Sequence, residues 1–169
     1  NSLLDLVCHE AYPGHHTEHA LKERRLFRER GWGEQAIQLI NTPECVVAEG
    51  IATLAAGMIF GDEAHAWAAE HLYPLAGITG DPEREARIAQ AQWNLRALSG
   101  NADIMLPEQG ADPEEVVRYI TRYGLRNQRE ARQSLRFIST PLWRPYIFTY
   151  FIGRQILGAW VEQGERRER

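Results

Sequence analysis

A repeated helix-start signal constrains the fold of this chain more than any other feature of its sequence. Four residues that carry a capping oxygen stand directly before a proline: Thr42, Asp81, Asp112 and Thr140. Proline at the first helical position loses only an N–H that has no partner there, so this order is typical of a helix N-terminus. Asn127 with Glu130 has the spacing of a capping-box variant. These positions therefore predict where helices begin.

The segments between these starts are rich in Ala, Leu, Glu, Gln and Arg, which are strong helix formers. Few runs alternate apolar and polar residues, so strands are not expected. We predict an all-α fold, a multi-helix array that forms a single domain over residues 1–169. The expected helices span residues 2–12, 15–30, 43–60, 62–75, 82–100, 113–123, 128–137 and 141–163. Connections that contain glycine are expected at residues 31–33, 77–80 and 100–110.

Composition and charge narrow the classes of partner. The formal net charge is −4, whereas nucleic-acid-binding domains usually carry a basic patch, so no nucleic-acid partner is expected. No apolar run is expected to reach the ~20 residues that span a bilayer. Cys8 and Cys45 lack a Cys-x-x-Cys spacing and are expected to be free thiols, which favours the cytoplasm. The chain begins with Asn1 rather than methionine, so we expect it to be the C-terminal part of a longer protein, and secretion stays open.

A candidate metal site lies close to the start of the chain, where residues 9–16 read His-Glu-Ala-Tyr-Pro-Gly-His-His. On a regular helix His9 and His15 would lie about 240° apart, and His9 and His16 would lie ~10 Å apart along the axis. Neither pair could share one metal ion in that geometry. Pro13 and the glycine after it break the helix, which can bring the later histidine back towards His9. His15 is the favoured second ligand because it keeps a Gly-His pair, and His16 is the close alternative.

His19 is a further candidate ligand. His15 and His19 are four residues apart and would chelate a metal without any helix break, but no glutamate follows His15 to act as a base. His19 is therefore expected to be exposed or to lie behind the ligands.

Glu49 is the expected third ligand, and it lies in the predicted helix 43–60. That helix is apolar almost all round and is expected to be buried. A buried carboxylate is costly unless it is paired or bound to a metal. One stripe of the helix carries Val47, Ile51, Leu54 and Met58, and the side of Glu49 carries Cys45, Ala52 and Ala56. These small neighbours would let another helix approach closely.

Two interpretations of these residues are open. Glu49 could pair with an arginine while the histidines are cap or core residues, which is the ordinary role of each residue taken alone. The combination favours a metal, because imidazole and carboxylate are zinc ligands and a catalytic zinc site uses three protein ligands. We predict Zn²⁺ held by His9, His15 and Glu49.

At these residues the sequence resembles a bacterial domain-of-unknown-function family of gluzincin-like zinc peptidases. The family pattern is His-Glu-x-x-Pro-Gly-His-His followed by Glu-Gly, which matches residues 9–16 and 49–50. The family is similar to carboxypeptidase Taq, thimet oligopeptidase and angiotensin-converting enzyme. A later motif, Tyr-x-x-Gly with a basic residue nearby, matches residues 150–154. Ile51 where tryptophan is usual, and Glu18 where glutamine is common, depart from the pattern and bear on substrate preference.

The resemblance implies that this chain is the C-terminal portion of a gluzincin-like helical metallopeptidase fold, with an N-terminal portion that completes the cleft. It implies zinc-dependent hydrolysis of peptide bonds, and a carboxypeptidase-like activity is one form that this could take. The zinc would polarise the scissile carbonyl, and Glu10 would take a proton from the attacking water and deliver it to the leaving amine.

Tyr150 and Arg154 are one helical turn apart on the last expected helix, and Tyr146 precedes them by the same step. Tyr150 could donate to the developing oxyanion, and Arg154 could hold a substrate carboxylate. The alternative is that the tyrosines are core aromatics and Arg154 is a surface or ion-paired residue.

Two other functions compete with peptide hydrolysis. One is hydrolysis of a non-peptide amide or ester at the same metal site. The other is a non-catalytic helical module that binds a metal. Glu10 separates catalysis from binding, because a pure binding site does not need an acid next to its first ligand.

Overall fold

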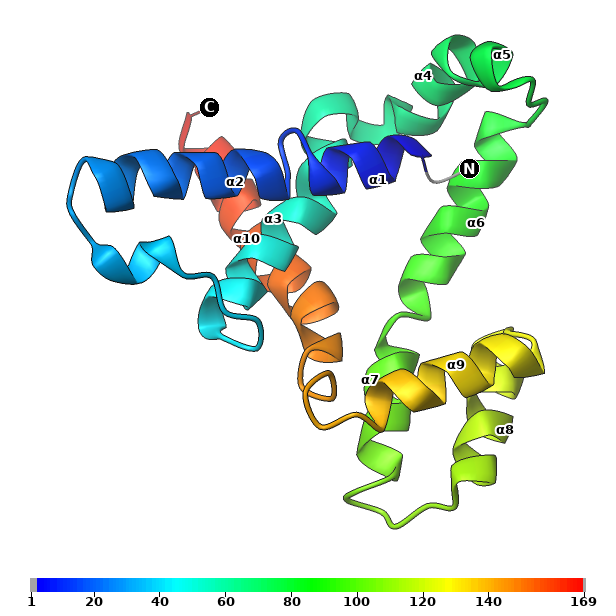
Figure 1. Cartoon of the computed structure of the whole chain (residues 1–169). Coiled ribbons are helices and arrows are strands. Elements are labelled where there is room, and N and C mark those ends of the chain that lie inside the picture. Colours follow the sequence, from blue (N-terminus) through cyan, green and yellow to red (C-terminus); the bar gives the residue numbers. More distant parts are fainter. Residues whose placement is uncertain (1–2, 169) are drawn as a thin grey trace.

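The computed structural model describes residues 3–168, and the side chains of residues 3–164. Every regular element in that part of the chain is helical, so the predicted all-α class is confirmed (Figure 1). The α-helices are α1 (Leu3–Glu10), α2 (His15–Lys22), α3 (Pro43–Phe60), α4 (Ala64–His71), α5 (Tyr73–Ala76), α6 (Pro82–Asn94), α7 (Ala97–Met105), α8 (Pro113–Tyr123), α9 (Gln128–Ile138) and α10 (Ile147–Glu168). A π-helical turn, Glu23–Arg28, continues α2, and short 3-10 turns occupy Gly33–Ala36 and Gly61–Glu63.

Three of the predicted helix caps form as expected. The Asp81 carboxylate accepts hydrogen bonds from the backbone N–H groups of two residues in the first turn of α6. The Asp112 carboxylate accepts the N–H of Glu114 at 2.8 Å. Asn127 and Glu130 form a reciprocal capping box at the start of α9. These contacts satisfy backbone donors that have no partner within the helix.

At two of the predicted helix starts the threonine hydroxyl does not cap a helix, although α3 does begin at Pro43 as predicted. The Thr42 hydroxyl donates to the Leu39 carbonyl instead of accepting from α3. The Thr140 hydroxyl donates to the Arg136 carbonyl in the last turn of α9, and residues 141–146 form turns. The last helix therefore begins at Ile147 and not at residue 141, and it continues beyond 163.

Other helix boundaries also differ from the prediction. Helix 82–100 is two helices, because the chain turns at Leu95 between α6 and α7. Gly100 lies inside α7 and not in a connection, because it packs against the Phe148 ring: a Cβ there would lie 2.8 Å from a ring carbon. The first helix ends at Glu10, the second becomes π-helical after Lys22, and segment 62–75 is divided between a 3-10 turn, α4 and α5. Residue 2 lies outside the described part of the chain.

The helices form two groups. Figure 1 shows α1 and α2 end to end beside α3, while α7, α8 and α9 cluster at the opposite end of the molecule. The main apolar cluster lies in that second group and comprises Leu98, Ala102, Val116, Val117, Ile120, Ala131 and Ile138. The candidate metal residues lie in the first group, where α10 packs along α3. The site is therefore built on a helix crossing and not on the main apolar cluster.

Helices α3 and α10 cross at Gly50 and Gly153. A Cβ at Gly153 would lie 2.2 Å from the Val46 carbonyl oxygen, and a Cβ at Gly50 would lie 2.6 Å from the Gly153 carbonyl oxygen. Real Cβ atoms do not approach backbone so closely, so this crossing needs glycine in both helices. The expected close approach of a second helix to α3 thus occurs one position after Glu49.

The buried face of α3 is the small-residue face. Cys45, Ala52 and Glu49 are buried, whereas Val47 is 43% exposed and Met58 is 57% exposed. The expectation that the whole helix is buried is therefore wrong. Small side chains let α10 and α1 approach one side, and the larger apolar side chains are left towards the outside.

The helical run Pro43–His71 is long and apolar enough, by length and composition, to cross a membrane. Its most apolar window has a mean hydropathy of 1.5, and 33% of that window is buried inside the protein. The run is longer than the sequence pattern suggested because α4 follows α3 after a single 3-10 turn. A core helix of a soluble protein passes the same test, so the absence of a membrane span stays a prediction.

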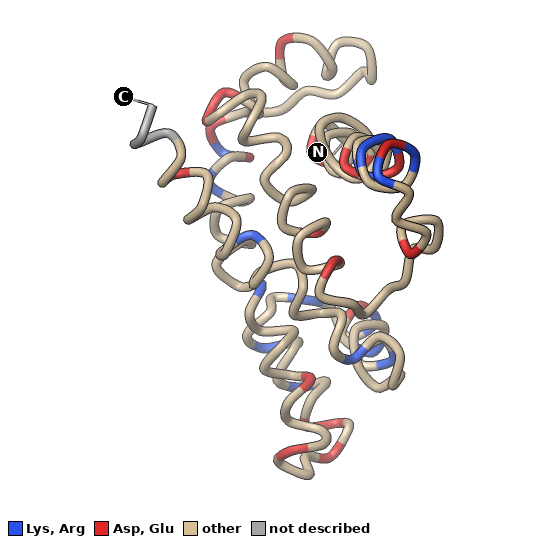
Figure 2. Tube along the Cα trace, turned by 90° about the vertical axis from the view of Figure 1, so that its left-hand side faces the viewer, with Lys and Arg blue, Asp and Glu red and all other residues tan. Residues whose placement is uncertain are grey.

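Acidic and basic residues are interspersed along the described chain (Figure 2). At the end of α2, for example, Arg25 pairs with Glu29 at 3.0 Å, and Arg28 pairs with Glu23. These side chains are exposed, so each pair contributes little to stability.

Candidate metal centre

The turn between α1 and α2 brings His9 and His15 to the same side of α3. Helix α1 ends at Glu10, and the Gly14 N–H donates to the Cys8 carbonyl at 3.0 Å before α2 begins at His15. A Cβ at Gly14 would lie 1.9 Å from the His9 carbonyl oxygen. The chain can therefore return this tightly only with glycine at this position, which explains the Pro-Gly insertion physically.

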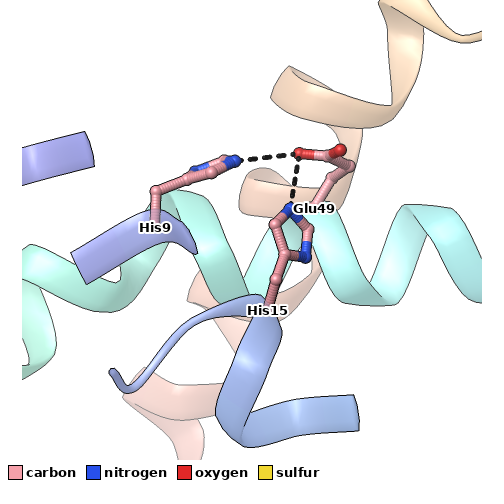
Figure 3. A group of neighbouring side chains, drawn as sticks. All are labelled: His9, His15 and Glu49. Atoms are coloured by element: carbon pink, nitrogen blue, oxygen red, sulfur yellow. Dashed lines mark ion pairs between the residues drawn. The ribbon is translucent and has the colours of Figure 1, made fainter. Parts of the chain in front are cut away.

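His9, His15 and Glu49 converge on one point (Figure 3). Nε2 of His9 lies 3.4 Å from Oε2 of Glu49, and Nε2 of His15 lies 3.6 Å from the same oxygen. The two imidazole rings meet edge to face, with centroids 4.8 Å apart. Glu49 is 3% exposed, and the side chains of His9 and His15 are 20% and 19% exposed. Three donor groups from three helices thus surround a partly open position.

The spacing of the three groups fits a metal ion. Two ligands that each lie about 2.1 Å from a tetrahedral zinc are roughly 3.4 Å from one another. The Nε2–Oε2 distances of 3.4 and 3.6 Å are close to that value, and the three ligand atoms all lie within 4.8 Å of one another. Among the described residues, Glu49 Oε2 is buried without a hydrogen-bond partner of normal geometry. A metal ion would satisfy this oxygen and both imidazoles together.

Tyr146 holds the Glu49 carboxylate from the other side. Its hydroxyl donates a hydrogen bond to Oε1 of Glu49, which leaves Oε2 facing the two histidines. Metal-binding carboxylates are commonly fixed by such an outer hydrogen bond. The sequence pattern predicted that Tyr146 shares a helix face with Tyr150 and Arg154. It did not predict the hydrogen bond to Glu49, because that bond joins residues 97 positions apart.

The titration of these groups reflects their contacts. Burial alone raises the pKa of Glu49, but the contacts with His15 and His9 and the hydrogen bond from Tyr146 outweigh it and lower the pKa to about 2. Contact with Glu49 raises the pKa of His15, and burial opposes that shift. Burial, followed by the hydrogen bond to Glu49, raises the pKa of Tyr146. Glu49 is therefore ionised, and Tyr146 stays a hydrogen-bond donor, at neutral pH.

Glu10 and Tyr150 lie at the edge of this group. Glu10 is exposed, directly after His9 at the end of α1, and its charge contributes to the raised pKa of His15. The half-buried Tyr150 ring meets the Tyr146 ring edge to face at 5.6 Å. Burial and then the charge of Glu49 raise the pKa of Tyr150, so its hydroxyl keeps a proton to donate.

Arg154 has contacts of its own away from the three ligands. Its guanidinium donates to the Thr53 carbonyl at 2.7 Å and lies 4.3 Å from the centre of the Trp93 ring. No ion pair of Arg154 occurs in the described part of the chain, which differs from the ion-paired alternative for this residue. Its predicted role towards substrate stays a prediction.

The structure separates His15 from the two other histidines considered above. His16 is exposed and lies outside the group that could hold a metal. His19 pairs with buried Glu18 at 3.1 Å, and its ring stacks on that of His15 at 5.8 Å. Glu18 also pairs with Lys22 at 2.6 Å. His19 therefore lies behind His15.

Comparisons with protein-family models, with curated proteins and with solved structures found no match for this chain. The resemblance to gluzincin-like zinc peptidases therefore stays an expectation from the sequence motifs, and the candidate metal group rests on the local geometry around Glu49.

Proposed function

We propose that this protein is a zinc-dependent hydrolase that cleaves peptide bonds. The observation that carries the proposal is the convergence of His9 Nε2 and His15 Nε2 on one oxygen of Glu49, with Glu10 next in the chain after His9. Two imidazoles and one carboxylate form the donor set of catalytic zinc sites, which keep one position open. Because the side chains of His9 and His15 are partly exposed, the group is not sealed from solvent, and water could reach such a position.

Zinc, when bound, supplies a Lewis acid that polarises a carbonyl and activates water. Glu10 is exposed and directly follows His9 in the chain. It acts as the base that takes a proton from the attacking water and gives it to the leaving nitrogen. Tyr150 keeps its proton and donates to the oxygen on which negative charge develops. Tyr146 holds the Glu49 carboxylate in place throughout.

A zinc-dependence experiment tests this function. The protein is freed of metal with a chelator, dialysed, and mixed with a pool of short peptides before and after one equivalent of zinc is restored. We expect cleavage products, identified by mass spectrometry, in the zinc-restored sample and none in the chelated one, because the ligands alone cannot activate water.

A matched pool of simple esters and non-peptide amides is the control for substrate class. If the esters and non-peptide amides are cleaved in the presence of zinc while the peptides stay intact, peptide hydrolysis is contradicted. Hydrolysis of a non-peptide amide or ester is then favoured. No cleavage of either pool by zinc-loaded protein would contradict catalysis.

A further inference from the structure

Two arginines meet at a single tryptophan, and the charge of one of them, Arg96, acts on Tyr150 of the candidate site. The guanidinium carbon of Arg96 lies 4.5 Å from the centre of the Trp93 ring, and that of Arg154 lies 4.3 Å from the same centre. Trp93 is at the end of α6, Arg96 follows that helix, and Arg154 comes from α10. Arg154 is also anchored to α3 through the Thr53 carbonyl. The indole therefore positions two positive charges contributed by different helices.

These two charges lack an acidic partner at contact distance. Arg132, by contrast, forms a bidentate pair with Glu114. Neither Arg96 nor Arg154 has an ion pair within 4.0 Å among the described residues. Asp5 is near enough to raise the pKa of both guanidiniums, but it contacts neither. Each guanidinium is attracted to the face of the indole, while the charge of Arg154 acts against that of Arg96.

Arg96 is accessible to a ligand. Its side chain is exposed to solvent, although neighbouring atoms crowd it, and this crowding and then the charge of Arg154 lower its pKa. A guanidinium has five N–H donors in a planar fork that matches a carboxylate. An exposed guanidinium beside a second, half-buried one is therefore suited to an anion with two oxygens.

Arg154 lies on the same helix as Tyr150, and Asp5, whose charge acts on both arginines, lies on the same helix as His9. Along α10, Tyr150 and Arg154 are one turn apart, and along α1, His9 and Asp5 are one turn apart, in each case a rise of ~6 Å. An extended peptide advances by roughly 3.3–3.6 Å per residue. A peptide whose scissile bond lies at His9, His15 and Glu49 could therefore place its C-terminus near the arginines after one to three residues.

We infer that Arg96 and Arg154, both positioned by Trp93, form a subsite for the free C-terminal carboxylate of a peptide substrate. Arg96 binds the carboxylate directly, and Arg154 adds positive charge from its fixed place on α3 and α10. The inference rests on the proposed function and deepens it, because it names the substrate class. Short peptides with a free C-terminus are bound, and the bond cleaved lies one to three residues from that end.

A binding experiment tests the subsite without relying on hydrolysis. Zinc-loaded protein with Glu10→Gln, which stops turnover, is titrated in a calorimeter with acetyl-trialanine and with its C-terminal amide. We expect the free acid to bind 10–100-fold more tightly than the amide, because a charge-assisted pair is lost in the amide. Adding Arg96→Gln should abolish this ratio, and adding Arg96→Lys should restore part of it.

Arg87→Gln is the matched control, since Arg87 is an exposed arginine of α6, the helix that precedes Arg96, and it pairs with Glu83. It should leave the acid-to-amide ratio unchanged. Thermal unfolding of each variant checks that the fold is intact. A free acid that binds no better than the amide, or a preference that survives Arg96→Gln, would overturn the inference.

Failure of the subsite and failure of the proposed function give different results. If the free acid binds more tightly than the amide but no peptide pool is cleaved, the subsite is supported and peptide hydrolysis is contradicted. If peptides with a free C-terminus and amidated peptides are cleaved at equal rates in the presence of zinc, peptide hydrolysis is supported and the subsite is contradicted.

Discussion

Replacing Glu10 by glutamine should lower the rate of peptide hydrolysis by about 100- to 10,000-fold while zinc stays bound. Glu10 follows His9, the first proposed ligand, and is exposed, so it can take a proton from water at the proposed metal. Glutamine has nearly the same shape but cannot accept that proton. The zinc content, measured by elemental analysis, should remain one equivalent, because no ligand is removed.

Glu70→Gln is the control for this experiment, because Glu70 is an exposed acid of α4 outside the metal group. Both the rate and the zinc content should match the unmodified protein. An unchanged rate in zinc-loaded Glu10→Gln protein would show that Glu10 is not the base.

Replacing Gly153 by alanine should destabilise the protein by about 2–3 kcal/mol, which corresponds to roughly 4–12 °C in the melting temperature. The new Cβ would lie 2.2 Å from the Val46 carbonyl and 2.9 Å from the Gly50 nitrogen, and both are backbone atoms that cannot rotate away. Helix α10 would have to move off α3. Because Tyr146 precedes α10 and holds Glu49, zinc affinity should fall as well.

Gly57→Ala is the matched control, since Gly57 lies on the exposed part of α3 and a Cβ there would meet nothing within 4 Å. This variant should be neutral or up to ~1 kcal/mol more stable, because alanine favours a helix. Melting curves followed by circular dichroism measure both. Equal stability of the two variants would contradict the close crossing at Gly50 and Gly153.

Local signals in the sequence were enough to predict much of the fold. Asp81 and Asp112 cap helices through contacts with their own neighbours, so their role can be read from adjacent residues. Gly100 gave a wrong boundary because a tertiary contact decides its role, and Thr140 gave one because its hydroxyl bonds to the helix before it and not to the one after it. Gly100 makes room for Phe148, 48 positions away, and Thr140 bonds backwards to the Arg136 carbonyl.

In the candidate site, too, the sequence predicted the residues that local spacing marks but not the contacts that depend on helix packing. The positions of His9 and Glu49 were marked by sequence spacing, and the Pro-Gly insertion suggested the bend that the structure contains. The roles of Tyr146 and Trp93 were not visible, because a hydroxyl that reaches Glu49 and an indole that gathers two arginines depend on how α3, α6 and α10 pack. Spacing along one helix could not reveal contacts among three.

The most direct test of the metal centre is anomalous diffraction at the zinc edge from crystals grown with one equivalent of zinc. We expect one peak per chain, about 2.0–2.2 Å from Nε2 of His9, Nε2 of His15 and a carboxylate oxygen of Glu49. The peak should vanish in His15→Ala crystals and persist in His16→Ala crystals, since His16 is exposed and outside the group. No peak at this position, or a peak that is lost with His16 and kept without His15, would contradict the proposed centre.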